Sequence, residues 1–347
     1  MYQRFFGLNR DPFSMTPDPA FLFLTAPHRE ALAGLTYSIL NRKGFVVLTG
    51  DAGTGKTTLL SRIFQSIPST RARFSVVLNP TLTPSEFLEL ALLDFGIPNV
   101  PASKAQRLGL LQQFLIESYK NNQVAVLVVD EAHKLPADVL EEVRLLSNFE
   151  LAEAKLLQIV LAGQTELGDI LNRQDLRQLK QRIAVRLAIH PLSATGVEHY
   201  IQHRWQKAGA AQPHPFQPDA VAQIAQCSRG IPRLVNALCD NALTVAFAEG
   251  QTTINAAHVI EVGRDLDLLD RQGRPSQPAS HATRPKIERK QNLASPVNRS
   301  VNGVVPVGTG SRLLAPPNLY GYESKTTKSS PLMRLVGKLG LSTKPTS

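Results

Sequence analysis

The sequence predicts an α/β fold built on a parallel sheet, followed by a small helical domain and a basic tail. The first indication is a set of continuously apolar segments, of which Val124–Val129 is the longest. A strand that is apolar at every position is buried on both faces, as in a parallel sheet covered by helices. The second is that these segments alternate with stretches whose leucines recur at helical spacing. The third is a glycine-rich turn at residues 50–58, between a strand and a helix.

The expected elements follow from the same patterns. After a lead-in rich in proline and aromatic residues, which we expect to be extended, strands are predicted at 45–48, 73–79, 124–129, 156–161 and 185–190. Helices are predicted at 27–41, from the turn to 66, and at 84–95, 103–121, 138–150 and 166–181. After Pro191 the pattern is helical only, at 194–208, 218–227, 232–248 and 255–268. We therefore divide the chain into a lead-in (1–30), an α/β core (31–191), a helical lid (192–269) and a tail (270–347).

Composition limits the class of protein. With 347 residues, of which 43% are hydrophobic, the chain is long enough for about two domains, each with its own hydrophobic core. No apolar run approaches the roughly 18–20 residues of a membrane-spanning helix, and the N-terminus does not read as a signal peptide. The two cysteines, Cys227 and Cys239, are expected to be buried thiols, which suits a reducing cytoplasm.

The basic charge belongs to the tail. The net charge is +10, yet residues 1–270 carry 25 Lys/Arg against 26 Asp/Glu, and residues 271–347 carry 13 against 2. The pI near 9.7 is therefore weak evidence for a nucleic-acid-binding core. Composition predicts a disordered tail. Its stretch 331–341 is either a short amphipathic helix for a partner or an acidic membrane, or unstructured.

The turn after the first strand has the spacing of a phosphate-binding loop, the Walker A motif. Its residues are Gly50, Asp51, Ala52, Gly53, Thr54, Gly55, Lys56, Thr57 and Thr58. Glycines let the backbone wrap closely around a phosphate, and the helix N-terminus adds its positive dipole end. Lys56 is expected to reach the β- and γ-phosphates of ATP, and the Thr57 hydroxyl to ligate Mg²⁺.

Two carboxylates end the strand at 124–129, where a Walker B pair is expected. Asp130 would hold Mg²⁺, and Glu131 would activate the attacking water. The alternative is an acidic pair that only caps the following helix. The letters Asp130-Glu131-Ala132-His133 also spell a helicase box. We set that reading aside because the rest of the chain has no second sheet.

These motifs together resemble the AAA+ ATPases, and within them the secretion-pathway protein A (ExeA-type) group. The resemblance covers about residues 1–268 and rests on 6–8, 12–13, 17–19, 28–32, 44–58, 130–133, 162–164 and 230–236. It implies a three-layer P-loop core with a five-stranded parallel sheet and an all-α lid. Proteins of that group continue into a transmembrane helix and a peptidoglycan-binding domain, and we expect this chain to lack both.

The resemblance also implies roles for residues outside the two motifs. Gln164 matches sensor 1, near the γ-phosphate, and Arg233 matches sensor 2, on the lid. An arginine finger would come from Arg177, Arg182 or Arg186, with Arg182 as first choice. A finger acts on a neighbouring subunit, so this implies a homo-oligomer, most often a ring. The alternatives are a turn residue for Gln164 and structural or surface arginines for the others. The lead-in either lines the pocket for the nucleotide base or only packs over the core.

Three functions remain open from the sequence. The first is Mg²⁺-dependent ATP hydrolysis by an oligomeric ATPase that remodels or assembles an envelope secretion, pilus or exopolysaccharide system. Such a protein would be cytoplasmic or peripheral at the inner membrane, with an inner-membrane or envelope assembly protein as partner. The second is a DNA-linked ATPase of the transposition-helper or origin type. Separately from that hypothesis, the basic tail could bind nucleic-acid phosphates non-specifically. The third is a nucleotide switch without useful turnover.

Overall fold

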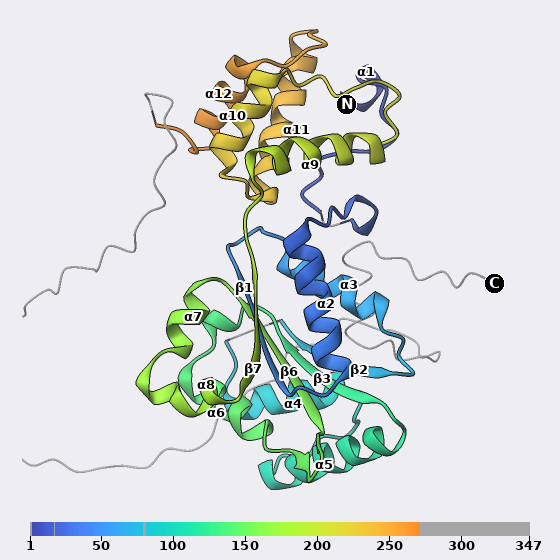
Figure 1. Ribbon diagram of the computed structural model, residues 1–347, viewed down its shortest axis with the longest axis vertical. Helices are drawn as coiled ribbons and strands as arrows, with labels where there is room; N and C mark the ends of the chain where they lie inside the picture. Colours follow the sequence, from blue (N-terminus) through green and yellow to red (C-terminus); the bar gives the residue numbers. More distant parts are fainter. Residues whose placement is uncertain (1, 17, 79–80, 271–347) are drawn as a thin grey trace, which may run out of the picture. The chain divides into compact units, whose positions relative to one another are not determined.

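The computed structural model describes residues 2–16, 18–78 and 81–270 (Figure 1). The predicted tail, with its candidate helix at 331–341, lies outside the described residues. Within the described ranges, no helix has both the length and the apolar character needed to cross a membrane.

The core contains a five-stranded sheet in which every pairing is parallel, as predicted. The order is β2-β3-β6-β1-β7, formed by β2 (Ala72–Val77), β3 (Val124–Val129), β6 (Leu157–Gly163), β1 (Phe45–Gly50) and β7 (Ile183–Ile189). Central β3 and β6 are buried at every residue, whereas edge strand β7 alternates between half-buried and exposed positions and is buried only at Ile189. Since the register pairs Thr49 with Gly163 and Val129 with Leu161, the carboxyl ends of β1, β3 and β6 lie together.

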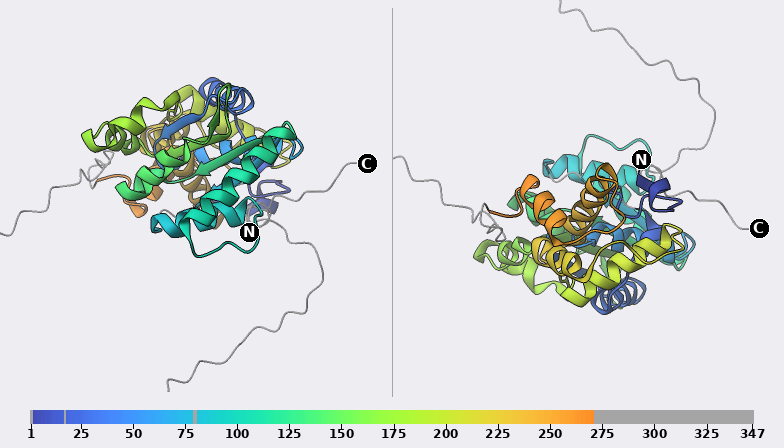
Figure 2. Two further views of the ribbon diagram at one scale, coloured as in Figure 1. Left: turned by 90° about the horizontal axis from the view of Figure 1, so that it is seen from below. Right: turned by 90° about the horizontal axis from the view of Figure 1, so that it is seen from above.

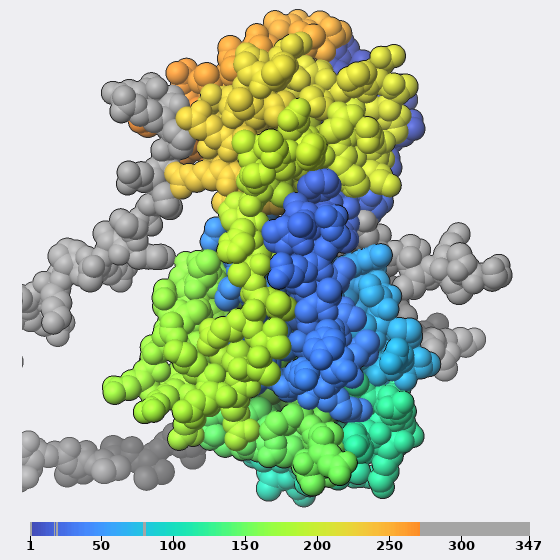
Figure 3. Space-filling model, viewed as in Figure 1, coloured from blue at the N-terminus to red at the C-terminus, as the bar shows by residue number. Residues whose placement is uncertain are grey.

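Helices cover both faces of the sheet and produce three layers (Figure 2). The even residues of β1, such as Val46 and Leu48, pack in one cluster with α2 (Ala26–Leu40) and α3 (Lys56–Ser66). Its odd residues, such as Phe45 and Val47, face a second cluster, which contains α4 (Pro84–Asp94), α5 (Lys104–Lys120) and α6 (Ala137–Leu146). This two-residue periodicity is what a strand buried on both faces requires. Helix α2 also packs beside edge strand β7 (Figure 3).

The lid is all-helical, as predicted, and has its own core. It comprises α9 (Ala194–Lys207), α10 (Pro218–Ser228), α11 (Pro232–Ala248) and α12 (Ala256–Asp265). Trp205 and Leu238 are buried in its cluster, and the buried free thiols of Cys227 and Cys239 belong to it. Phe13 and other lead-in side chains complete the same cluster, so the lead-in packs on the lid.

Three local predictions were wrong. The lead-in is not purely extended, because it contains α1 (Tyr2–Phe5) and the 3₁₀ turn η1 (Pro19–Phe21). The helix predicted to reach 150 ends at Leu146, because the chain then forms a hairpin of β4 (Glu150–Leu151) and β5 (Ala154–Lys155). The helix predicted over 166–181 is divided into α7 (Glu166–Leu171), η3 (Gln174–Leu176) and α8 (Arg177–Gln181).

The break after α7 has a packing reason. Leu171, Leu176 and Leu179 are all buried in one cluster. In a continuous helix, Leu171 and Leu176 would lie about 140° apart around the axis and could not face the same core. The turn between α7 and α8 removes this conflict.

Candidate functional site

The loop between β1 and α3 has a backbone that only glycine accommodates well at several positions. Gly53 and Gly55 have φ of 81° and 101°, in the left-handed region. A Cβ on Gly50 would lie 2.6 Å from the carbonyl oxygen of Ile189. A Cβ on Gly53 would lie 2.8 Å from the Cβ of Arg233, because the loop packs against the start of the lid helix α11. The glycine spacing is therefore a steric requirement of this turn.

The loop leaves backbone donors free at the helix start. Gly55 is the N-cap of α3 and supplies no side-chain hydrogen bond, so the first N–H groups of α3 have no partner within the helix. The Gly55 N–H itself donates to no group of the described residues. Unpaired N–H groups and the positive end of the helix dipole together favour an anion at this position.

Lys56 lies folded back over this loop. Its Nζ donates to the carbonyl oxygens of Gly50, at 2.7 Å, and Asp51, at 3.0 Å. Burial lowers the pKa of Lys56, and the nearby charges of Asp130 and Glu131 oppose this effect. An ammonium group has three donors, so one N–H remains for a ligand after these two hydrogen bonds.

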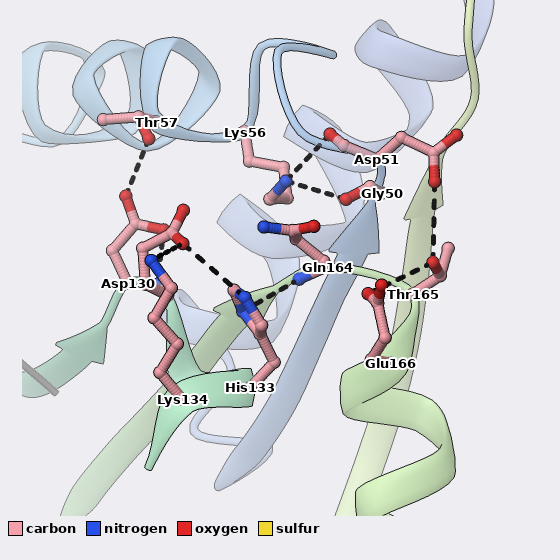
Figure 4. A network of polar contacts seen from close by, with 11 residues as sticks. Gly50, Asp51, Lys56, Thr57, Asp130, His133, Lys134, Gln164, Thr165 and Glu166 are labelled. Carbon is pink, nitrogen blue, oxygen red and sulfur yellow. Dashed lines mark hydrogen bonds and ion pairs between the residues drawn. The ribbon is translucent and has the colours of Figure 1, made fainter. Parts of the chain in front are cut away.

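Thr57 and Asp130 meet as a Mg²⁺ site would require (Figure 4). The Thr57 Oγ1 donates to Asp130 Oδ2 at 2.7 Å, and the other carboxylate oxygen accepts the Glu131 N–H at 2.9 Å. These are hard oxygen ligands, and two of them leave the remaining octahedral positions for phosphate oxygens and water. No group of three or more His, Cys, Asp or Glu residues in the described ranges could hold a metal ion by itself. The residues therefore fit Mg²⁺ bound together with a nucleotide.

Glu131 lies beside this pair in a left-handed backbone conformation, with φ of 54°. Its Oε2 is 3.0 Å from Lys134 Nζ and 3.7 Å from His133 Nε2. Partial burial raises the pKa of Glu131, but the hydrogen bond and charge of Lys134, with those of His133 and Lys56, outweigh it and lower the pKa overall. The carboxylate is thus ionised at neutral pH and able to accept a proton.

His133 connects Glu131 to Gln164. The backbone N–H of Gln164, directly after β6, donates to His133 Nδ1 at 3.3 Å (Figure 4). In the neutral ring, this leaves the proton on Nε2, the nitrogen nearer to Glu131. From the sequence, His133 was part of a possible helicase box and of the 130–133 stretch that carried the family resemblance, but it was assigned no role. Its position two residues after Glu131 was a usable signal.

A cavity of about 660 Å³ collects most of the predicted residues. Its lining includes the phosphate loop from Ala52 to Thr58, together with Glu131, Gln164 and Arg233. The lead-in contributes Ser14, Phe21 and Phe23. Lead-in residues therefore line the cavity as well as pack on the lid. That they line the pocket for the nucleotide base stays a prediction.

The two predicted arginines lie in different places. Arg233, at the start of α11, lines the cavity, and its N–H donates to the Gly53 carbonyl oxygen at 3.4 Å. Arg182 precedes β7, at the opposite end of that strand from Ile189, which pairs with Gly50. Its guanidinium donates to the Ser147 carbonyl oxygen at 3.4 Å. Arg182 thus lies outside the cavity of its own chain, as do the other candidates, Arg177 and Arg186.

Several cavity residues were not assigned a function from the sequence, among them Tyr200, Arg204, Asn236 and His28. Tyr200, Arg204 and Asn236 come from the lid, where the Tyr200 hydroxyl donates to Asn236 Oδ1 at 2.9 Å and Arg204 Nη1 donates to Tyr200 at 3.0 Å. His28 comes from α2. Tyr200 and Arg204 belong to an amphipathic helix and form no motif, whereas Asn236 ends the 230–236 stretch that carried the family resemblance. His28 stood within a stretch that carried the family resemblance, but no role followed from that.

The fold and this site are those of an AAA+ P-loop core. Residues 39–171 match the family described as "AAA domain". The chain is related to general secretion pathway protein A of Aeromonas hydrophila, with 43% identity over 255 residues. That alignment covers 73% of this chain and 46% of that protein, so the chain spans about half the length of this relative. The resemblance inferred from the motifs is confirmed.

A second relative has a different activity in its name. ATP-dependent target DNA activator B of Escherichia phage Mu is 27% identical over 261 residues, which cover 73% of this chain and 75% of that protein. Among solved structures, the ORC2 protein of Aeropyrum pernix has a TM-score of 0.55 at 16% identity, covering 76% of this chain and 75% of that one. Cdc6p of Pyrobaculum aerophilum has a TM-score of 0.55 at 19% identity, covering 71% and 70%. At such identities the two structures show the shared fold alone.

Proposed function

We propose that this protein is an oligomeric AAA+ ATPase that hydrolyses ATP to ADP and phosphate with Mg²⁺. One observation carries the proposal: Thr57 Oγ1 and Asp130 Oδ2 lie 2.7 Å apart beside the unpaired N–H groups of the phosphate loop. A hydroxyl and a carboxylate at that distance, next to a phosphate site, are the protein ligands of Mg²⁺–ATP in P-loop enzymes.

Each residue then has a defined task. The residues Gly50, Asp51, Ala52, Gly53, Thr54, Gly55, Lys56, Thr57 and Thr58 bind the phosphates, with Lys56 at the β- and γ-phosphates. Mg²⁺ held by Thr57 and Asp130 would neutralise charge on the phosphate oxygens. Glu131 takes the proton of the attacking water, and Gln164 orients that water. Arg233 carries the state of the γ-phosphate to the lid.

The site is completed by a neighbouring subunit in this proposal. Arg182 lies outside its own cavity, which is the arrangement that an arginine acting in trans requires. Such an arginine stabilises charge in the transition state and accelerates phosphoryl transfer by orders of magnitude. Arg177 and Arg186 are the other candidates for the finger.

The biological role that we propose is the assembly or remodelling of an envelope secretion, pilus or exopolysaccharide system. Its support is the 43% identity with general secretion pathway protein A. The partner would be an inner-membrane or envelope assembly protein, and the ATPase would act in the cytoplasm, peripherally at the inner membrane.

Phosphate release by the purified full chain tests the enzymatic part. Wild-type protein should release phosphate from ATP only with Mg²⁺. Lys56→Ala should lose nucleotide binding, and Glu131→Gln should bind ATP without turning it over. Hydrolysis retained by Glu131→Gln would refute the assignment of the base. Nucleotide binding without turnover in the wild type, with and without candidate partners, would favour the switch function.

A DNA-linked ATPase is the second candidate, and one observation favours it. The chain covers 75% of the length of the phage Mu target DNA activator, against 46% of the secretion protein. DNA should then stimulate ATP hydrolysis, and this stimulation should survive removal of residues 271–347. Stimulation that disappears with the tail would indicate only non-specific binding of phosphates by its 13 Lys/Arg residues.

A further inference from the structure

His28 contacts the phosphate loop from outside the motif. Its Nε2 lies 3.1 Å from the carbonyl oxygen of Thr54, and its Nδ1 lies 2.6 Å from Thr25 Oγ1. The side chain is buried, at 6% exposure, and burial lowers the pKa of His28 although the hydrogen bond to Thr54 opposes this. The carbonyl oxygen can only accept, so Nε2 carries the proton and donates.

Thr25 fixes the orientation of this ring. It is the N-cap of α2, where its side chain accepts the His28 N–H at 3.4 Å. With the ring proton on Nε2, the nitrogen Nδ1 accepts the Thr25 hydroxyl proton. The ring is thus held at both nitrogens, and its donor is directed at one carbonyl group of the loop.

That carbonyl group determines where the next amide points. Thr54 C=O and Gly55 N–H belong to one planar trans peptide, so the two groups point in opposite directions. Gly55 has φ of 101° and lacks a Cβ, so its own backbone preference does not fix this peptide. Its N–H donates to no group of the described residues, and Gly55 lines the cavity.

We propose that His28 is a positioning residue for the phosphate loop. By holding the Thr54 carbonyl, it keeps the Gly55 N–H directed toward the bound phosphates and so sets the affinity for nucleotides. A preorganised donor costs nothing to orient when the ligand arrives, whereas a loop free to rotate this peptide must lose that freedom on binding. This inference rests on the proposed nucleotide site.

His258 is a matched control within the same chain. Like His28, it is the third residue of a helix whose N-cap side chain accepts its N–H, and it too is buried, at 6% exposure. Its ring nitrogens contact the N–H of Asn255 and the carboxylate of Glu249, and it does not line the cavity. A purely structural role in helix capping would make the two histidines equivalent.

The test compares His28→Phe, His28→Gln and His258→Phe in the full chain. A glutamine amide nitrogen can take the place of Nε2 as donor to Thr54, whereas phenylalanine keeps the ring shape and donates nothing. Binding of fluorescent ADP and AMP is measured by titration, and melting temperatures are recorded without nucleotide. If the Gly55 N–H no longer points at the charged phosphate, the loss of that one hydrogen bond corresponds to a roughly tenfold or larger change in the Kd for ADP.

We expect His28→Phe to weaken ADP binding about tenfold or more, His28→Gln to restore most of it, and His258→Phe to leave it unchanged. Because AMP lacks the β-phosphate, its affinity should change less than that of ADP. Equal ADP affinity in wild type and His28→Phe would overturn the proposal. It would also be overturned if His28→Phe and His258→Phe both lost ADP affinity in proportion to their drop in melting temperature. If the wild type binds no nucleotide, the proposed function itself fails.

Thr25→Val removes only the hydroxyl that holds the His28 ring. It should weaken ADP binding less than His28→Phe does, and an unchanged affinity in Thr25→Val would contradict the proposed role of Thr25 in orienting His28.

Discussion

Lys134 Nζ lies 3.0 Å from Glu131 Oε2, so the proposed base is paired with a lysine in the structure. Both side chains are partly exposed, at 55% and 36%, and water therefore screens the pair. The pairing still has a consequence for pH dependence, because it contributes to the lowered pKa of Glu131.

Replacing Lys134 should move the acid limb of the pH profile. A base must be ionised, so activity is lost as the pH falls through the pKa of Glu131, which is depressed in the wild type. Lys134→Ala removes the hydrogen bond and the charge that contribute most to lowering the pKa of Glu131, so the limb should shift to higher pH. Steady-state ATPase rates between pH 4 and pH 8, with exposed Lys180→Ala as control, measure the shift. If the acid limb does not move, Glu131 is not the group whose ionisation limits the rate at low pH.

Asp130→Asn should raise the Mg²⁺ requirement. The amide keeps the shape of the side chain but loses the charge that would hold the cation beside Thr57. We expect ATP turnover at low millimolar Mg²⁺ to fall at least about 100-fold and to recover partly at higher Mg²⁺. Mg²⁺ titrations of phosphate release measure this, and exposed Asp138→Asn is the control. An unchanged Mg²⁺ midpoint would remove Asp130 from the metal site.

Mixing two inactive variants tests the arginine finger. Arg182→Ala and Glu131→Gln should each lose most ATP hydrolysis, the first by roughly 1000-fold or more. Because a site would combine Glu131 of one subunit with Arg182 of its neighbour, mixed oligomers contain some sites with both groups intact. Mixing should therefore restore measurable phosphate release, and the same mixture made with Arg177→Ala or Arg186→Ala shows which arginine acts. Absence of any restoration for all three would argue against a finger in trans.

Gly230→Ala should destabilise the fold. Gly230 has φ of 73°, and a Cβ there would lie 1.9 Å from the Leu192 carbonyl oxygen, where the Leu192 N–H donates to Gly230 at 2.8 Å. We expect a loss of at least about 1–2 kcal/mol in the free energy of unfolding. Gly109→Ala is the matched control, because Gly109 lies within α5 with open space around it, and should gain about 0.5–1 kcal/mol. Urea unfolding measures both. Equal effects of the two substitutions would contradict this account.

The parallel sheet and the nucleotide motifs were predictable because their signals are local. A continuous apolar segment of six mostly β-branched residues, such as Val124–Val129, favours a strand buried on both faces. The glycine spacing of the loop is a steric requirement of one turn. The break after Leu171 was not predictable from spacing, because it depends on which core the neighbouring leucines must reach. The hairpin at Glu150–Lys155 is likewise too short to leave a periodic pattern.

By itself, the sequence determined the fold class, the loop with the spacing of a phosphate-binding motif and the two carboxylates at the end of β3. Only the tertiary structure decided which distant side chains join them. His133 lies between Glu131 and Gln164, and His28 reaches the loop from α2, because the packing of helices on the sheet brings these residues together. No spacing along the chain encodes such contacts, since each depends on how separate elements pack. The same packing places Arg233 in the cavity and Arg182 outside it.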